Sequence, residues 1–343
     1  AGASRYCAAQ TAVPDPLREP SSFVASIEEL VESWGIDVLI PISEPSLLAV
    51  LPERDRFAGV RIPFPPYDRF LSICDKAAVA EAAGEVGIRV PGQVVLDSPE
   101  EARDRLPRMA FPLVLKPVRS VAGTDASRVK VSVRHVADDA SLERALDDFP
   151  REAYPILAQE RIVGPGLGVF LLMSEGEPRA AFGHRRLREK PPSGGVSVLR
   201  ESIALPPDLL ERSVALLRRF DWEGVAMVEY KVSEATGEPY IMEINGRFWG
   251  SLQLAVDAGV DFPRLLLDEA LASGDAGRPS RSTGPVSRPG PRVTDYTVGI
   301  RSRWEWGDVD HLLARLRRSD EELALPPGSP GRLRSVLDFL AGL

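Results

Sequence analysis

The clearest pattern of apolar and polar positions lies between residues 224 and 247. Each half of this stretch is a short run in which apolar residues recur, and the turn signal Thr-Gly-Glu-Pro at residues 236–239 separates the halves. Two such runs on either side of a turn predict a β-hairpin. The apolar positions are Val225, Met227, Val228, Ile241 and Ile244.

The polar positions of this hairpin gather on one face. Glu243, Asn245 and Arg247 share one parity, so their side chains point to the same side of the strand. Glu229 can lie beside them in the other strand. Burying this set without partners is costly, whereas Mg2+ would bind the oxygens and a phosphate the guanidinium. The pattern predicts a metal–nucleotide site; the alternative is a solvated edge hairpin whose charges pair with each other.

The apolar spacing near the N-terminus predicts an incomplete α/β unit. A helix is expected over Phe23–Trp34, with Ser22 as its N-cap and Gly35 at its end. The almost continuously apolar run Asp37–Ile42 predicts a buried parallel strand, and Pro45–Leu51 a second helix. Alternating strands and helices indicate a doubly wound domain, of which only about one unit is visible.

Two lysines stand at the ends of predicted elements. Asp75 fits the N-cap of a helix over Ala77–Val86, which places Lys76 near the positive end of that helix. The ordinary role of such a lysine is a solvated surface group. Lys116 closes the apolar strand Phe111–Pro117, where an unpaired ammonium would be expensive to bury.

A loop of small residues, 118–125, follows the strand that ends near Lys116. It contains Ser120 and Gly123, and backbone N–H groups in such a loop can surround phosphate oxygens while Lys116 adds a point charge. The loop does not have the Walker spacing Gly-x-x-x-x-Gly-Lys-Ser/Thr, so by itself it is a weak indication of a phosphate site.

A basic run follows a second predicted hairpin, which is formed by Val169–Met173 and Arg179–Gly183. In the run His184–Lys190 the alternation puts Arg186 and Arg188 on one face. This face is either an exposed basic segment in a loop or a clamp for an anion, because arginine suits bidentate contact with carboxylate or phosphate.

The rest of the pattern completes an alternation of helices and strands with no internal repeat. Helices are predicted over Ser141–Phe149, Pro207–Phe220, Phe248–Ala258, Phe262–Ala272, His311–Leu316 and Leu333–Leu340, strands over Val129–Val133, Ile156–Val163 and Tyr296–Trp306, and surface loops over Pro191–Gly195 and residues 273–293.

Composition narrows the class of protein. The 343 residues are enough for about two or three domains, and 44% hydrophobic with 27% charged residues is ordinary for a globular chain. A net charge of −8 without a basic stripe argues against a nucleic-acid partner. Cys7 and Cys74 suggest two reduced thiols in a cytoplasmic protein rather than a disulfide framework or zinc site. No signal peptide and no apolar run approaching roughly 20 residues is seen. The start at Ala1 indicates further sequence upstream.

With its segments in this order, the chain resembles the ATP-grasp superfamily from roughly Asp75 to Leu271. Lys76 with its helix looks like the lead-in of that family, Phe111–Pro117 like the strand of its second phosphate-binding lysine, and Gln159–Gly164 like the segment that links its two lobes. The runs Gly183–Arg186 with Gly194-Gly195, and Asn245–Ser251, look like the carboxylate–amine ligase and carbamoyl-phosphate-synthase-like branch.

The resemblance implies an α/β fold with α+β lobes. A partial, Rossmann-like domain would occupy residues 1–74, an ATP-grasp domain 75–273 with its small lobe at about 108–160, and a linker with a C-terminal extension 274–343. The implied nucleotide ligands are Lys76, Lys116, Ser120, Gly123 and the backbone of Glu160 and Ile162; the implied ligands of Mg2+ or Mn2+ are Glu229, Glu243 and Asn245; the implied catalytic residues are Arg247, on the transferred phosphoryl group, and Arg186 and Arg188, on an anionic substrate.

The implied reaction uses ATP to convert a substrate carboxylate into an acyl phosphate, from which an amine displaces phosphate to form an amide. Alternatives are another ATP-grasp outcome, either a kinase or a carboxyphosphate-forming enzyme, and a nucleotide-binding protein without turnover. The partners are small molecules, with neither nucleic acid nor membrane, and a homodimer is left open. The sequence departs from the family at residues 165–168, which lack the acidic residue that often binds ribose.

Overall fold

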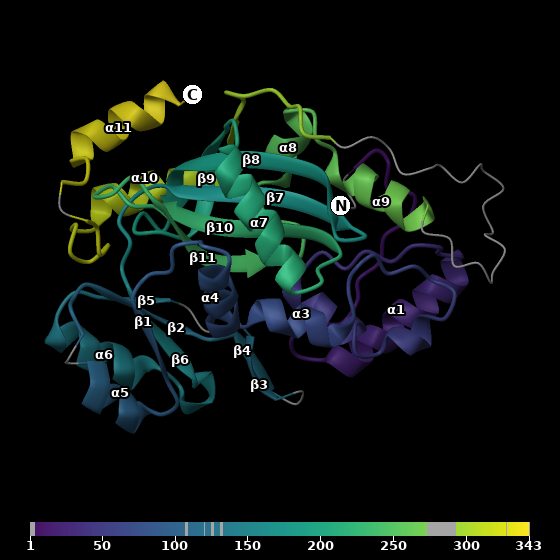
Figure 1. Ribbon diagram of the computed structural model, residues 1–343, viewed down its shortest axis with the longest axis horizontal. Coiled ribbons are helices and arrows are strands. Elements are labelled where there is room, and N and C mark those ends of the chain that lie inside the picture. Colours follow the sequence, from purple (N-terminus) through teal and green to yellow (C-terminus); the bar gives the residue numbers. More distant parts are fainter. Residues whose placement is uncertain are drawn as a thin grey trace.

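The structure is a computed structural model that describes residues 4–106, 109–119, 121–124, 127–130, 133–272, 293–326 and 328–342 (Figure 1). Its centre is a six-stranded antiparallel sheet, here called the large sheet, with the strand order β11-β10-β7-β8-β9-β12. The strands are β7 (Gly166–Ser174), β8 (Glu177–Lys190), β9 (Val196–Ser202), β10 (Gly224–Val232), β11 (Pro239–Asn245) and β12 (Arg301–Arg303).

Both hairpins predicted from the sequence are present in the large sheet. The pair β10–β11 matches the hairpin between residues 224 and 247, and β7–β8 turns at Glu175-Gly176. The basic run His184–Lys190 is not a loop, because β8 continues through it and pairs with β9. The sequence pattern did not indicate β9. The predicted strand Tyr296–Trp306 is reduced to β12, and α10 begins within it.

A second, four-stranded antiparallel sheet, here called the small sheet, has the order β1-β6-β2-β5. It has a separate apolar core, in which Leu115 of β2 and Ile156 of β6 are fully buried under α5 and α6. Asp138 caps α6 by accepting from the backbone N–H of Ser141. The elements are β1 (Gln93–Leu96), α5 (Pro99–Arg105), β2 (Leu113–Pro117), β5 (Arg134–Val136), α6 (Asp139–Asp148), a 3-10 turn (Arg151–Ala153) and β6 (Ile156–Glu160), with the ribbon β3 (Val121–Thr124) and β4 (Ser127–Lys130) beside them.

The N-terminal part is helical where the sequence predicted an α/β unit. The predicted strand Asp37–Ile42 is wrong, because these residues make only one parallel bridge, between Val38 and Arg61. Pro41 and Pro63 flank that bridge and lack the N–H groups that would extend it. The helices are α1 (Pro20–Trp34), α2 (Glu44–Val50), a 3-10 turn (Arg54–Phe57), α3 (Tyr67–Cys74) and α4 (Lys76–Glu85).

Capping explains where several of these helices begin. Asp75 accepts from the backbone N–H groups of Ala77 and Ala78, as predicted, so α4 begins at Lys76. Ser22 is not the N-cap of α1, because Pro20 occupies the first turn, which its fixed φ favours, and Glu19 takes the capping position. Gly35 ends α1 in the left-handed conformation at φ 64°, as expected.

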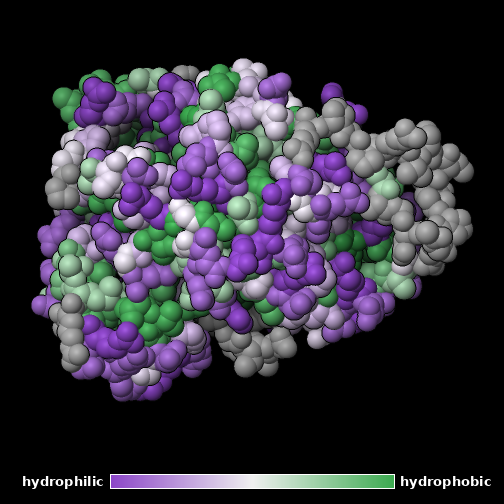
Figure 2. Space-filling model, viewed as in Figure 1, coloured by the Kyte–Doolittle hydropathy of each residue, from purple (hydrophilic) through white to green (hydrophobic). Residues whose placement is uncertain are grey.

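One large apolar core joins the N-terminal helices to the large sheet and to the helices that cover it. Amphipathic α7 (Pro207–Arg219) lies across one face, where Ser213 Oγ is 2.8 Å from the hydroxyl of buried Tyr230 (Figure 1). Its outer side belongs to the hydrophilic surface at the centre of Figure 2. Helices α8 (Leu252–Asp257) and α9 (Phe262–Ala272) follow the hairpin. No helix among the described residues is long and apolar enough to cross a membrane.

The C-terminal helices α10 (Glu305–Arg317) and α11 (Arg332–Ala341) dock on the end of β8 (Figure 1). Their anchor is Asp308, which is fully buried and accepts two hydrogen bonds from Arg188, at 2.6 and 2.5 Å, and one from Arg303, at 2.7 Å. Arg188 also donates to the carbonyl of Asp338 in α11. The predicted loop at 273–293 lies outside the described residues except for Val293.

We predict that Asp308→Ala destabilises the protein by about 3–5 kcal/mol, because it leaves two guanidinium groups in a buried place without their carboxylate. Urea unfolding followed by circular dichroism measures the effect. Asp310→Ala is the matched control: Asp310 lies two residues further along α10, is half exposed and pairs with Lys190, so its loss is worth at most about 1 kcal/mol. Equal midpoints for both variants would contradict the anchoring role of Asp308.

Candidate active site

Strand register aligns one residue from each of four strands in a row on the large sheet. Glu243 of β11 lies opposite Glu229 of β10, as the sequence predicted. Glu229 in turn pairs with Gly168 of β7, and Gly168 with His184 of β8. Directly paired residues point to the same side of a sheet, so these residues share one face. Tyr230, the next residue after Glu229 in β10, points to Ser213 of α7, so the row lies on the face opposite α7. Two carboxylates are thus held side by side.

The end of the hairpin continues this polar row as a chain of hydrogen bonds. Asn245 donates its side-chain N–H to Glu243 Oε1 at 3.0 Å, and Arg247 donates to Asn245 Oδ1 at 2.9 Å. Arg247 also donates to the carbonyl of Phe248 at 2.8 Å, which fixes its guanidinium beside the row. Glu243, Asn245 and Arg247 therefore form one hydrogen-bonded set, and strand pairing holds Glu229 beside it.

Lys116 approaches this set from the small sheet. A β-bulge in β11 leaves Met242 as an extra residue between the pairs Glu229–Glu243 and Tyr230–Ile241. The ammonium of Lys116 donates to the carbonyl of Met242 at 3.3 Å and to Gln159 Oε1 at 3.0 Å. The side chain is 7% exposed, so the small sheet presents a buried cation to the edge of the carboxylate row.

Lys76 reaches the same carboxylates from the start of α4. Its backbone N–H donates to the carbonyl of Val118, just beyond β2, which ties the helix to the strand of Lys116. Its ammonium lies 3.9 Å from Glu243 Oε2, and the side chain is 7% exposed. A lysine that composition alone would leave in solvent is therefore part of the site.

Burial and neighbouring charges set the ionisation of these groups. Burial lowers the pKa of Lys116 to about 8, against the attraction of Glu243. Burial raises the pKa of Glu229, which the guanidinium of Arg186 offsets only in part. Burial also opposes the ionisation of Glu243, but Lys76 and Lys116 outweigh it, so the pKa of Glu243 lies below its ordinary value.

Arg186 spans the large sheet to reach the row. It starts on β8, crosses β7 and donates to Glu229 Oε2 on β10 at 2.5 Å. The crossing depends on Gly166, because a Cβ there would lie 2.7 Å from Cδ of Arg186. The second residue that faces this side of β7, Gly168, is also a glycine. Neighbouring side chains occupy the space over both glycines: Arg186 lies over Gly166, and Phe170 and His184 lie over Gly168.

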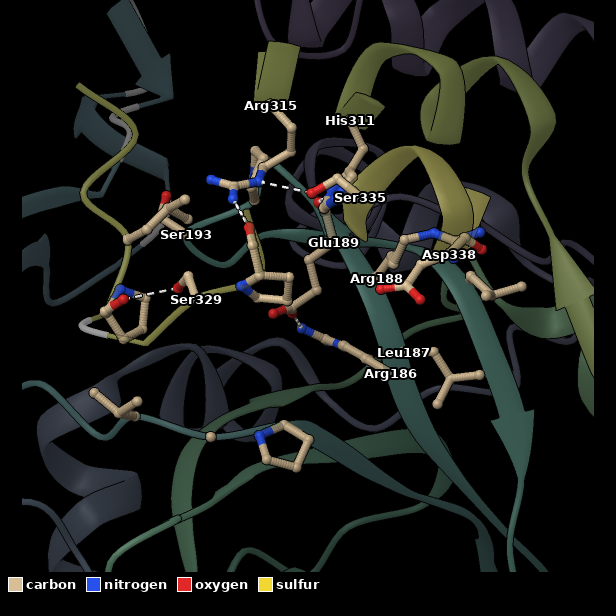
Figure 3. A pocket seen from close by; sticks show the side chains of 18 of the residues that line it. Arg186, Leu187, Arg188, Glu189, Ser193, His311, Arg315, Ser329, Ser335 and Asp338 are labelled. Carbon is tan, nitrogen blue, oxygen red and sulfur yellow. Dashed lines mark hydrogen bonds and ion pairs between the residues drawn. The ribbon is translucent and has the colours of Figure 1, made fainter. Parts of the chain in front are cut away.

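A pocket of about 530 Å3 opens beside Arg186 (Figure 3). One wall is the segment 161–165, which follows β6, and another is the end of β8; the C-terminal helices close the third side. In Figure 3 Arg186 points to Glu189, while Arg188 lies beside Asp338. The lining contains six basic residues, Arg161, Arg186, Arg188, Lys231, Arg301 and Arg315, and three acidic ones, Glu189, Glu234 and Asp338, so it favours an anionic ligand.

The remaining predicted site residues fall in different places. Ile162 lines the pocket, whereas Glu160 ends β6 with its backbone N–H donated to the carbonyl of Gly92. Gly123 lies in β3, and Ser120 is outside the described residues. Arg188 reaches the pocket wall, but its guanidinium is held by Asp308.

Sequence reasoning missed several residues of this site. Lys231 shares the parity of Glu229, and this signal was available. Glu189 and Glu234 bring carboxylates to the pocket beside the segment 161–165. Residues 165–168, which follow directly, have no acidic side chain. His311 holds the carbonyl of Glu189 through Nδ1 at 2.6 Å. No local pattern indicated that α10 would pack there.

Several known proteins are similar to this chain. A family model described as "ATP-grasp in the biosynthetic pathway with Ter operon" matches residues 152–288, which include the whole carboxylate row. The carbamoyl phosphate synthase large chain of Thermus thermophilus is 26% identical over 199 residues, which cover 55% of this chain and 18% of that protein. The chain thus spans less than a fifth of that relative.

Solved structures share the fold. The L-amino acid ligase from Bacillus licheniformis aligns with a TM-score of 0.57 and 19% identity over 73% of this chain and 60% of that one. The biotin carboxylase domain of the Hydrogenobacter thermophilus 2-oxoglutarate carboxylase, solved with MgADP, ADP and bicarbonate, aligns with a TM-score of 0.56 and 18% identity over 81% and 61% of the two chains. The solved structures share the fold, and the family model places residues 152–288 of this chain among sequences similar to ATP-grasp proteins.

Proposed function

We propose that this protein is an ATP- and Mg2+-dependent carbon–nitrogen ligase that activates a carboxylate as an acyl phosphate and transfers the acyl group to an amine. One observation carries the proposal: Glu229 and Glu243 lie paired on the large sheet, and Lys76 and Lys116 converge on the same place from α4 and the small sheet. Oxygen ligands for a hard cation and ammonium groups for phosphate therefore meet between the two lobes.

The donor set fits Mg2+ that is shared with a nucleotide. Glu229, Glu243 and Asn245 supply hard oxygen ligands, but only two of them are carboxylates. Among the described residues, no group of three or more His, Cys, Asp and Glu could hold a metal by protein ligands alone. Mg2+ is usually bound by one or two protein carboxylates, and water and phosphate oxygens complete its coordination shell. Two carboxylates and an amide oxygen are therefore enough. When bound, Mg2+ would neutralise charge on the phosphates and orient them for transfer.

The residues around this set are assigned to different parts of the nucleotide. Lys116 and Lys76 face the triphosphate, and Arg247, fixed by Asn245, stabilises the charge of the transferred phosphoryl group. We place the adenine against Ile162 in the pocket and assign the ribose hydroxyls to Glu189 or Glu234 beside it. Phosphoryl transfer needs chiefly positioning and charge stabilisation, so the site needs no nucleophilic side chain.

The proposed reaction has two steps, phosphoryl transfer to the carboxylate and acyl transfer to the amine. A carboxylate oxygen of the substrate attacks the γ-phosphorus, the bond to the β-phosphate oxygen breaks, and ADP and an acyl phosphate form. The nitrogen of the amine then attacks the acyl carbon, the bond to phosphate breaks, and the amide forms as the amine loses a proton. The basic pocket beside Arg186 is suited to hold the anionic substrate, whereas the guanidinium of Arg188 is already bound to Asp308 and to the carbonyl of Asp338.

A second candidate is a carboxyphosphate-forming enzyme, in which bicarbonate takes the place of the carboxylate. The bicarbonate-bound carboxylase domain with the same fold is the specific observation in its favour. Release of ADP and phosphate from Mg-ATP, measured with pooled carboxylates, pooled amines or bicarbonate, separates the two. Release that requires one carboxylate and one amine supports the ligase; release with bicarbonate alone supports the alternative. If Mg-ATP bound but no mixture gave release, the ligase proposal would be abandoned in favour of a binding protein.

We predict that Glu243→Ala lowers ATP turnover by roughly 100-fold or more, because it removes an ionised oxygen ligand and the partner of Lys76. The assay is ADP release at saturating Mg-ATP. Glu238→Ala is the matched control in the same hairpin: Glu238 is half exposed and pairs with Arg89, away from the row. Equal turnover in the two variants would refute the role of Glu243.

We predict that nucleotide affinity falls as the pH rises through about 8, because the Lys116 ammonium, whose pKa burial lowers to about 8, loses its charge there. The decline should reach at most about tenfold per pH unit, the limit for one linked proton. Titration with a fluorescent ATP analogue between pH 7.5 and 9.5 measures it. Lys116→Arg, which stays charged, should flatten the curve, and an unchanged slope in that variant would assign the titration to another group.

A further inference from the structure

The side chain of Arg186 joins the carboxylate row to the loop that follows β8. One terminal nitrogen, Nη2, donates to Glu229 Oε2 at 2.5 Å. The other, Nη1, donates to Glu189 Oε1 at 2.9 Å and to the carbonyl of Gly195 at 3.0 Å. The side chain is 9% exposed, so one nearly buried guanidinium serves two carboxylates and the loop.

The contact with Glu229 competes with the metal that the proposed function requires. The oxygen that receives Nη2 belongs to one of the two carboxylates that would bind Mg2+. Glu229 and Glu243 lie side by side, and two neighbouring negative charges need a positive charge near them. In the absence of metal, Arg186 supplies that charge to Glu229, whereas Lys76 and Lys116 supply it to Glu243.

The position of Arg186 also allows it to leave Glu229 without losing every partner. Glu189 and the carbonyl of Gly195 hold it at the pocket side, and its Nε is a buried donor that has no hydrogen-bond partner within the described part of the chain. The aliphatic part of the side chain lies over Gly166, where no Cβ limits its position, and Phe170 and His184 fill the space over the next glycine that faces this side, Gly168. A guanidinium that gives up Glu229 therefore remains at the edge of the basic pocket.

We propose that Arg186 exchanges partners when the site is loaded: it neutralises Glu229 in the metal-free protein, and metal binding releases it toward the pocket, where it binds the carboxylate of the substrate. This inference rests on the proposed function, because it takes Glu229 as a metal ligand. Arg186 thus couples the metal to the anionic substrate. Such coupling is reciprocal: a carboxylate in the pocket that draws Arg186 away strengthens metal binding.

The test measures the affinity for Mn2+ by electron paramagnetic resonance, with saturating AMP-PNP as the non-hydrolysable ATP analogue. Arg186→Gln should tighten Mn2+ binding by about tenfold or more, because a close charge pair no longer competes for Glu229. Gly166→Ala keeps the charge but would place Cβ 2.7 Å from Cδ of Arg186, so it should tighten binding in the same direction. Thermal unfolding of each variant confirms that it is folded.

Arg185→Gln is the matched control. Arg185 precedes Arg186 on β8, is exposed and pairs with Glu201, so its removal changes the net charge equally without touching Glu229. Tightening in Arg186→Gln and Gly166→Ala but not in Arg185→Gln supports the exchange. Tightening in both arginine variants but not in Gly166→Ala would show a general charge effect and overturn it, as would unchanged or weaker binding in Arg186→Gln. If AMP-PNP with Mn2+ did not bind the wild type, the proposed function itself would fail.

Discussion

The site depends on two carboxylates that strand pairing holds side by side on one face of the large sheet. Glu229 and Glu243 are opposite each other in an antiparallel pair, and backbone hydrogen bonds fix that arrangement whether or not a ligand is present. Like charges at this distance repel, and partial burial makes the repulsion stronger. Nearby cations compensate the two negative charges: Lys76 and Lys116 lie beside Glu243, and Arg186 lies beside Glu229.

Each cation reaches the carboxylates because of a specific backbone feature. The β-bulge in β11 turns the carbonyl of Met242 into an acceptor for Lys116, which links the small sheet to the large one. The cap at Asp75 starts α4 one residue later, and this places Lys76 at the site. Gly166 leaves room for Arg186 to cross β7. The chemistry therefore depends on the two sheets, α4 and β8 being packed together.

The core of the candidate site could be predicted from the sequence because its signals are local. Alternation along a strand placed Glu243, Asn245 and Arg247 on one face, and the turn signal brought Glu229 next to them. The apolar run before Lys116 and the cap before Lys76 were equally local. These features need only the two-residue period of a strand and the chemistry of one helix end.

What the sequence could not predict depends on contacts between distant segments. Asp308 reads as an ordinary acidic residue of an amphipathic helix, and nothing near it indicates that it would be buried against Arg188, 120 positions earlier. The run after His184 is too polar to resemble a strand, yet β9 pairs with it. The apolar run Asp37–Ile42 resembles a strand, but the prolines beside it and beside its partner limit it to one bridge.

The anomalous scattering of manganese in a crystal grown with Mn2+ and AMP-PNP would locate the metal and the nucleotide directly. One or two peaks are expected between the oxygens of Glu229, Glu243 and Asn245, with the triphosphate against Lys116 and Lys76. Manganese and triphosphate bound elsewhere on the molecule, with Glu229 and Glu243 contacting neither, would contradict the central claim that this face of the large sheet is the nucleotide site.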